Sequence, residues 1–320
     1  MKTKLPFLLL ILLGLTTVQR LAAQQAPQYT QYIFNELIIN PAYSGSKDIM
    51  NINATYRSQW TGLEGAPSTQ TLSVDGPAKN NRLGWGVHLM NDAAGAQSQT
   101  GVYANIAVRI YLSRKSQLSL GVGSGVAQYT LDGTKLNPGD DVPDIAIPET
   151  RESEILPDAK LGIFFNTERY YAGLSVANLI PFRDDKRIIA TPRRHYFFST
   201  GYMFDLGPYL RLKPSFLLKD DFRGPANLDF NAFFVIYNRL WLGGSYRTSA
   251  PIFTDVNMDE IKKRNAWALM AQVYATQKFR IGYSYDVSLT KMRDYSSHEV
   301  SLGYSIFRKQ LGRTITPRNL

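Results

Sequence analysis

The chain has 320 residues, a hydrophobic content of 44% and a formal net charge of +10. It is too long for a minimal domain, and its hydrophobic content excludes a largely disordered protein. Cys is absent, which excludes disulfides and a lipid attached through an acceptor Cys. The 19 Tyr, 16 Phe and 24 Gly favour strands and turns over helices.

Residues 1–23 have the features of a secretory signal peptide. Lys2 and Lys4 give a positive start, an apolar run covers 5–15, and two Ala close the segment. The apolar run is too short for a membrane anchor, which needs ~20 residues. Loss of three basic residues with the signal leaves a mature charge of 10 − 3 = +7. For an exported protein, this balance favours solvated loops or an anionic partner over nucleic acid.

Apolar and polar residues alternate through most of the mature chain. In 100–111, Val102, Ile106 and Val108 lie on one face and Tyr103 and Asn105 on the other. Period-two alternation predicts strands with one apolar face and one polar or small-residue face. The predicted strands, fourteen in all, are 49–60, 68–76, 83–91, 100–111, 116–129, 158–166, 169–178, 194–206, 209–219, 226–237, 240–247, 265–275, 279–286 and 297–308.

Tight turns and longer polar links alternate between these strands. Residues 167–168 and 238–239 form tight turns, whereas 130–157, 179–193 and 248–264 form long links. This rhythm is typical of an outer-membrane barrel, with short periplasmic turns and long outer loops. No mature segment reaches 18 apolar residues, which excludes a spanning helix. The sequence therefore predicts an all-β, antiparallel transmembrane barrel of about 14 strands, although a repetitive soluble β-protein can show a similar rhythm.

The predicted barrel covers 49–308 and is preceded by the segment 24–48 and followed by a tail, 309–320. An even strand count puts both termini on the short-turn, periplasmic side. Fourteen strands enclose a lumen wider than side chains alone fill, so the lumen must be wet, plugged or occupied. We expect 24–48 to lie in the periplasm or to plug the lumen. Four basic residues with inward positions suit a wet interior: Arg109, Lys160, Arg211 and Lys213.

Several short motifs occur in a characteristic order in the N-terminal third of the chain. Residues 40–45 read Asn-Pro-Ala-Tyr-Ser-Gly, 56–62 read Tyr-Arg-Ser-Gln-Trp-Thr-Gly, and 84–86 read Gly-Trp-Gly. In these motifs the chain resembles the PorP/SprF family of the type IX secretion system, and weaker matches continue over nearly the whole mature chain. The candidate family-motif residues, structural or docking in role, are Asn40, Pro41, Tyr43, Gly45, Tyr56, Arg57, Gln59, Trp60, Gly62 and Pro67.

This resemblance implies a protein of the cell outer membrane that helps type IX cargo, such as gliding or surface adhesins, to reach or stay on the cell surface. It implies partners among the periplasmic and outer-membrane components of that system, the secreted cargo and the lipid bilayer. It carries over no catalytic residue. The alternative function is a passive porin or small-solute transporter, which a polar lumen of this size allows.

Local structural roles account for most of these residues. Asn40 caps its own backbone and Pro41 fixes φ, so the pair is expected to start a turn. Arg57 and Gln59 share one face of the first strand, where Arg57 is expected to fix the strand by pairing with a lumenal carboxylate such as Asp75. Tyr56 and Trp60 lie on the other face or at the strand end.

Catalytic and metal-binding patterns are missing from the sequence. The three His, at positions 88, 195 and 298, lack metal-ligand spacing, and no Ser or acid is placed beside them to build a triad. Residues 121–125 are rich in Gly but lack the Lys-Ser/Thr and the helix of a phosphate loop, so these Gly are expected to allow strand curvature or bulges. We therefore predict no enzyme activity, cofactor or metal.

Overall fold

The computed structural model describes residues 27–136, 148–180, 192–253 and 265–307. The predicted signal peptide and C-terminal tail lie outside the described residues, as do parts of three predicted long links. Among the described residues, no helix is long and apolar enough to cross a membrane.

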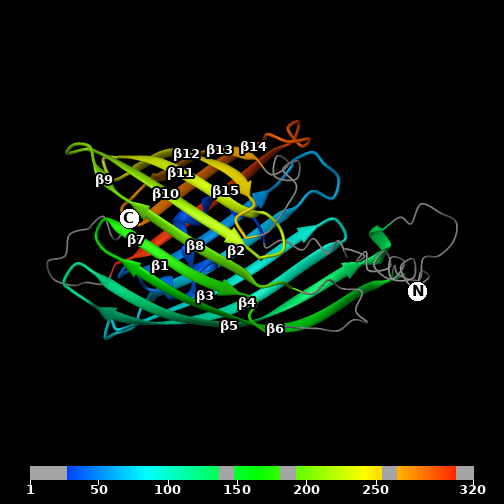
Figure 1. Cartoon of the computed structure of the whole chain (residues 1–320), viewed down its shortest axis with the longest axis horizontal. Coiled ribbons are helices and arrows are strands. Elements are labelled where there is room, and N and C mark those ends of the chain that lie inside the picture. Colours follow the sequence, from blue (N-terminus) through cyan, green and yellow to red (C-terminus); the bar gives the residue numbers. More distant parts are fainter. Residues whose placement is uncertain (1–26, 137–147, 181–191, 254–264, 308–320) are drawn as a thin grey trace, which may run out of the picture.

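The described strands form one closed antiparallel sheet (Figure 1). Neighbours along the chain pair with each other, and the ring closes where β1 pairs with β15, from Met50↔Ile306 to Ser58↔His298. A two-residue segment, β9, continues β8 beyond Met203, so the barrel wall has fourteen strands, as predicted. The strands are β1 Met50–Ser58, β2 Ser68–Pro77, β3 Leu83–Ala94, β4 Gln97–Tyr111, β5 Gln117–Asp132, β6 Arg151–Asn166, β7 Tyr170–Ala177, β8 His195–Tyr202, β9 Phe204–Asp205, β10 Leu210–Asp220, β11 Ala226–Ile236, β12 Leu240–Ala250, β13 Ala266–Tyr274, β14 Phe279–Ser288 and β15 Ser296–Ile306.

The two faces of the sheet have the compositions that the alternation predicted. In β4, Ile106 is 61% exposed on the outside, whereas Tyr103 and Asn105 are each 2% exposed on the inside. An apolar outer band suits contact with lipid chains, and closure leaves no strand edge to be desolvated in the bilayer. The fold therefore follows from period-two patterning together with the need to pair every backbone group.

Two details of the sequence-based prediction were wrong. Strand β6 begins at Arg151 and not at 158, because β5 and β6 stay paired as far as Asp132↔Arg151, which shortens the predicted link at both ends. The Gly-rich stretch at 121–125 contains no bulge, since β5 keeps an unbroken register with β4. These Gly residues have another role, described below.

The two ends of the barrel differ in their links. At one end, which we call the short-turn rim, lie tight connections such as 167–169 and 237–239, together with the start of β1 and the end of β15. At the other end, the long-loop rim, lie 59–67, 133–150, 178–194 and 251–265, although the β3–β4 link at this rim has only residues 95–96. The short-turn rim is at the left of Figure 1.

Candidate functional site

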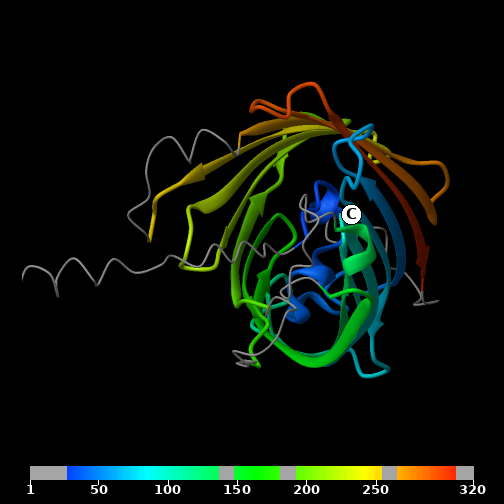
Figure 2. The same cartoon turned by 90° about the vertical axis from the view of Figure 1, so that its right-hand side faces the viewer.

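The chain segment before the first strand, residues 27–49, lies inside the barrel (Figure 2). We call it the strap. It contains three 3-10 helices, η1 Gln31–Phe34, η2 Glu36–Ile38 and η3 Pro41–Tyr43. Residues 30–37 and 39–46 are all buried. As the even strand count predicts, β1 begins and β15 ends at the same rim. The strap, which precedes β1, crosses the lumen to reach that rim.

One side of the strap packs against an apolar patch on the inner wall. Phe34 meets Phe233 of β11 and Trp241 of β12 edge to face, with ring centroids 5.4 and 5.8 Å apart. Phe233 and Trp241 are fully buried. Tyr32 and Ile33 of η1 belong to the same cluster. An apolar patch facing water in a lumen would be unfavourable, so the strap and the wall stabilise each other as a protein core does.

A later part of the strap, residues 40–44, lies closely against Gly residues of the wall. A Cβ at Gly121 would lie 2.5 Å from the carbonyl carbon of Pro41 and nearer still to Ala42. A Cβ at Gly84 would overlap the carbonyl of Ser44, and one at Gly162 would overlap the Asn40 side chain. These Gly residues are therefore small because the strap occupies the space that a side chain would need.

A buried polar cluster holds the N-terminal part of the strap. Glu299 of β15 accepts hydrogen bonds from the backbone N–H groups of Thr30, at 2.8 Å, and Gln31, at 3.0 Å. Arg57 of β1 pairs with Glu299 at 3.2 Å and with Asp286 of β14 at 2.9 Å, and it donates to the Thr30 hydroxyl. Charge-assisted bonds of this kind are stronger than neutral ones.

Arg57 therefore pairs with lumenal carboxylates, as expected, but Asp75, the carboxylate named as an example, is not among them. Strand register explains the difference: Arg57 stands opposite Glu299 in β15, whereas Asp75 stands opposite Asn51, six residues away along β1. Asp75 instead accepts the backbone N–H of Gly45 at 3.0 Å. That Gly has φ +69, a conformation that other residues adopt rarely, and its Cα faces the backbone of Gly76.

An acidic side chain lies in the middle of the strap. Glu36 is buried and accepts a hydrogen bond from the Ser199 hydroxyl at 3.3 Å. Lys213 of β10 supplies a positive charge near this buried carboxyl.

Four of the motif residues belong to the strap and seat it in the lumen. The Asn40 side chain accepts the N–H of Ala42 at 2.9 Å, which caps η3, and donates to the carbonyl of Ile163 in β6 at 3.1 Å. Pro41 follows at the first position of η3. The Tyr43 ring packs edge to face on Phe164, 5.4 Å away. Gly45 lies at the short-turn end, where its N–H bonds to Asp75.

The basic residues with inward positions have different surroundings. Lys160 lies over the ring of Tyr103, 4.0 Å from its centroid, and Lys213 lies 5.1 Å from the Trp241 ring. Arg109 bonds to Asp48 at the end of the strap. Arg211 pairs at 3.0 Å with Asp205, near the end of its strand. Three of the four therefore contact the strap or the aromatic wall around it.

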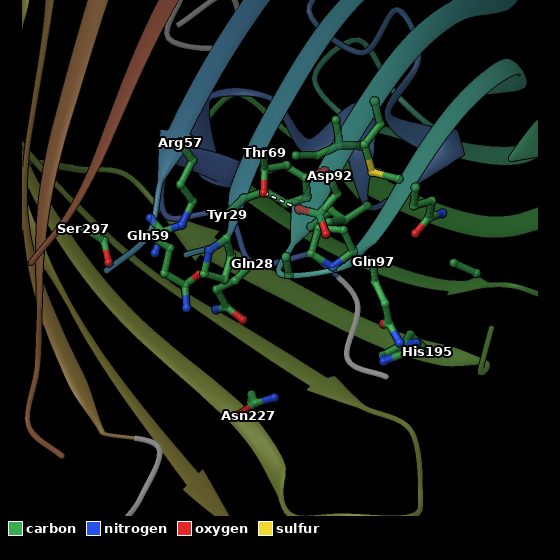
Figure 3. A pocket seen from close by; sticks show the side chains of 18 of the residues that line it. Gln28, Tyr29, Arg57, Gln59, Thr69, Asp92, Gln97, His195, Asn227 and Ser297 are labelled. Carbon is green, nitrogen blue, oxygen red and sulfur yellow. Dashed lines mark hydrogen bonds between the residues drawn. The ribbon is translucent and has the colours of Figure 1, made fainter. Parts of the chain in front are cut away.

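A cavity of about 700 Å³ opens at the N-terminal end of the strap, between the strands near the long-loop rim. We call it the vestibule (Figure 3). Gln28 and Tyr29 of the strap project into it, and polar side chains from several strands surround them. The lining is rich in amide side chains, namely Gln28, Gln59, Gln97, Gln99, Asn178, Asn227 and Asn265. Amides donate and accept hydrogen bonds at once, so this wall can bind uncharged polar groups such as peptide backbone.

Of the other six candidate family-motif residues, four line the vestibule and two lie elsewhere. Arg57, Gln59, Trp60 and Pro67 all line it. The backbone N–H of Trp60, a residue with φ +52, donates to Ser297 at 3.1 Å, which joins the β1–β2 link to β15. Tyr56 points outward and is 50% exposed. Gly62, with φ +97, lies in the exposed link itself.

Sequence reasoning missed the polar cluster and the strap contacts of the wall glycines. One signal was available: in β11, Phe230 and Phe234 face outward while Phe233 and Val235 face inward and are buried. A lipid-facing strand needs only one apolar face, so apolar residues on both faces indicate that something covers the inner one. Among the described residues, no group of His, Cys, Asp and Glu can hold a metal ion.

Comparison with known proteins adds the family. No curated protein matches the chain. Among solved structures, the chain is similar to the outer membrane protein Omp33 of Acinetobacter baumannii, with 9% identity, a TM-score of 0.48, and coverage of 81% of this chain and 98% of that chain. It is also similar to a FadL homologue of Pseudomonas aeruginosa, with 10% identity, a TM-score of 0.47, and coverage of 89% and 95%.

The family model described as type IX secretion system membrane protein PorP/SprF matches residues 21–304, which include the strap and nearly all of the barrel. The match agrees with the motifs singled out above. The chain therefore belongs to the PorP/SprF family of type IX secretion system membrane proteins, and it is a β-barrel of the outer membrane.

Proposed function

We propose that this protein works in type IX secretion as a filled barrel that binds other proteins, and that it is neither an open pore nor an enzyme. The observation that carries the proposal is the buried strap. Its backbone lies against wall glycines such as Gly121, and its rings pack on Trp241. A lumen occupied in this way suits a docking platform better than a route for solutes.

The two rims offer different surfaces for partners. In outer-membrane barrels the short turns face the periplasm and the long loops face outward. The short-turn rim therefore suits components of the machine in the periplasm. The vestibule, with its amide-rich lining, suits a secreted cargo protein at the cell surface. Protein-protein recognition by such surfaces needs no catalytic group and no cofactor.

A pull-down in gentle detergent, analysed by mass spectrometry, tests the binding role. Gln59→Arg puts a long cation into the vestibule, and Gln277→Arg makes the same change in the exposed β13–β14 turn at the short-turn rim. We expect Gln59→Arg to lose surface cargo while keeping periplasmic partners. Gln277→Arg should keep the cargo. If both variants retain every protein that the wild type retains, the assignment of partners to rims is wrong.

The passive-pore alternative is separated by conductance in planar bilayers. A purified barrel with the strap docked should be silent or show only brief openings. A strain that lacks the protein should fail to secrete or retain some surface protein. Large, steady channels in the wild-type protein, together with unchanged secretion in the deletion strain, would refute the binding role and favour the pore.

A further inference from the structure

The contacts of the strap give its direction through the barrel. Thr30 bonds to Glu299 and Asp286, which lie in the half of β15 and of β14 nearer the long-loop rim. Asn35 bonds to Ser73, in the middle of β2, at 2.9 Å. Gly45 bonds to Asp75, two residues nearer the short-turn rim. The strap therefore runs from the long-loop rim to the short-turn rim, where β1 begins.

The N-terminal end of the strap is consequently at the vestibule. Pro27 and Gln28 both line that cavity. The Gln28 side chain accepts a hydrogen bond of 2.7 Å from Lys219, next to the end of β10 at the long-loop rim. Residues 27–29 are only partly buried, in contrast to the buried residues that follow. The strap is thus held by the wall from Thr30 onward, whereas residues 27–29 are accessible from the vestibule.

We infer that the N-terminal end of the strap is displayed at the outer surface of the cell, as the floor of the vestibule, although the barrel itself begins and ends at the periplasmic rim. A protein that enters the vestibule from outside then contacts Gln28 and Tyr29 directly. The strap is at once the filling of the lumen and part of the outward docking surface. This inference uses the orientation of the barrel and does not depend on which partners it binds.

The absence of native Cys allows a clean labelling test. Single-cysteine variants are treated, in intact cells, with a maleimide that does not cross the outer membrane. Pro27→Cys reports on the strap. Lys291→Cys, in the exposed β14–β15 link, reports on the outer rim, and Lys278→Cys, in an exposed short turn, reports on the periplasmic rim. If Pro27→Cys does not accumulate in the membrane, Gln28→Cys replaces it.

We expect Pro27→Cys and Lys291→Cys to be labelled in intact cells, and Lys278→Cys only after permeabilisation. Labelling of the strap variant only after permeabilisation would overturn the inference, because the strap would then enter from the periplasm. Labelling only in denaturant would also overturn it, since the strap end would be enclosed. Reversed labelling of the two Lys variants would refute the orientation of the barrel on which the inference relies. None of these outcomes is affected by loss of a cargo protein.

Discussion

Replacing Gly121 by Ala should displace the strap while leaving the barrel wall intact. The new Cβ would lie 2.5 Å from the carbonyl carbon of Pro41, where ordinary contact begins at 3.4 Å. The atoms that it meets belong to the backbone of Pro41 and Ala42, so no side-chain rotation relieves the overlap. The strap must move by about 1 Å or leave its seat, and overpacking of this kind typically costs about 1–3 kcal/mol.

That cost acts on docking of the strap and not on strand pairing, because Gly121 keeps its partners Ala107 and Gly162. The population of barrels with a released strap should therefore rise by about 5- to 150-fold, the factor equivalent to about 1–3 kcal/mol. Planar-bilayer recordings should show more frequent openings. Limited proteolysis should cleave the strap faster by a similar factor, because cleavage follows the population of the open form.

The matched control is Gly207→Ala, in a short turn where a new Cβ has nothing within 4 Å. This variant should conduct and resist protease like the wild type. If Gly121→Ala also matches the wild type in both assays, the strap does not rest against β5, and the packing argument is refuted.

Two further changes test the other contacts of the strap. Arg57→Met leaves Glu299 buried without its cation and should destabilise the folded barrel by about 3–5 kcal/mol; adding Glu299→Gln should restore part of the loss in heat-induced gel-mobility shifts, and no restoration would contradict the pairing. Phe34→Ala should weaken strap docking by about 3–5 kcal/mol, measured as faster strap proteolysis, whereas Phe204→Ala, at an outward site that is 47% exposed, should not; equal rates would argue against the aromatic seat.

The wall of the barrel could be predicted from the sequence because period-two patterning is local. Each strand carries its own alternation, as in β4, and the closed ring follows from the lipid-facing side alone. Strand ends were less predictable, since Arg151 joins β6 through pairing with Asp132, which no local pattern reveals. The general architecture is thus a property of short windows of sequence.

The candidate site could not be predicted in the same way because its contacts join distant parts of the chain. Thr30 and Glu299 are 269 positions apart, and their meeting depends on barrel closure. The motif at 40–45 was recognisable in the sequence. Its contacts with the wall glycines could not be predicted, because they exist only when the strap lies in the lumen. The inward apolar residues of β11 were a usable signal, since they lack any reason to be apolar in a wet interior.

The position of the Arg57–Glu299 pair has a consequence for how the protein is assembled. These residues stand opposite each other on the first and last strands, where the ring closes, and both contact Thr30. A ring that closed first would have to admit a folded segment through a narrow opening, whereas closure around the segment needs no threading. We expect the strands to assemble around the N-terminal segment. The pairing of β1 with β15 should then form once Glu299 and Arg57 both contact Thr30. We therefore expect insertion into the membrane and filling of the lumen to occur as one cooperative event.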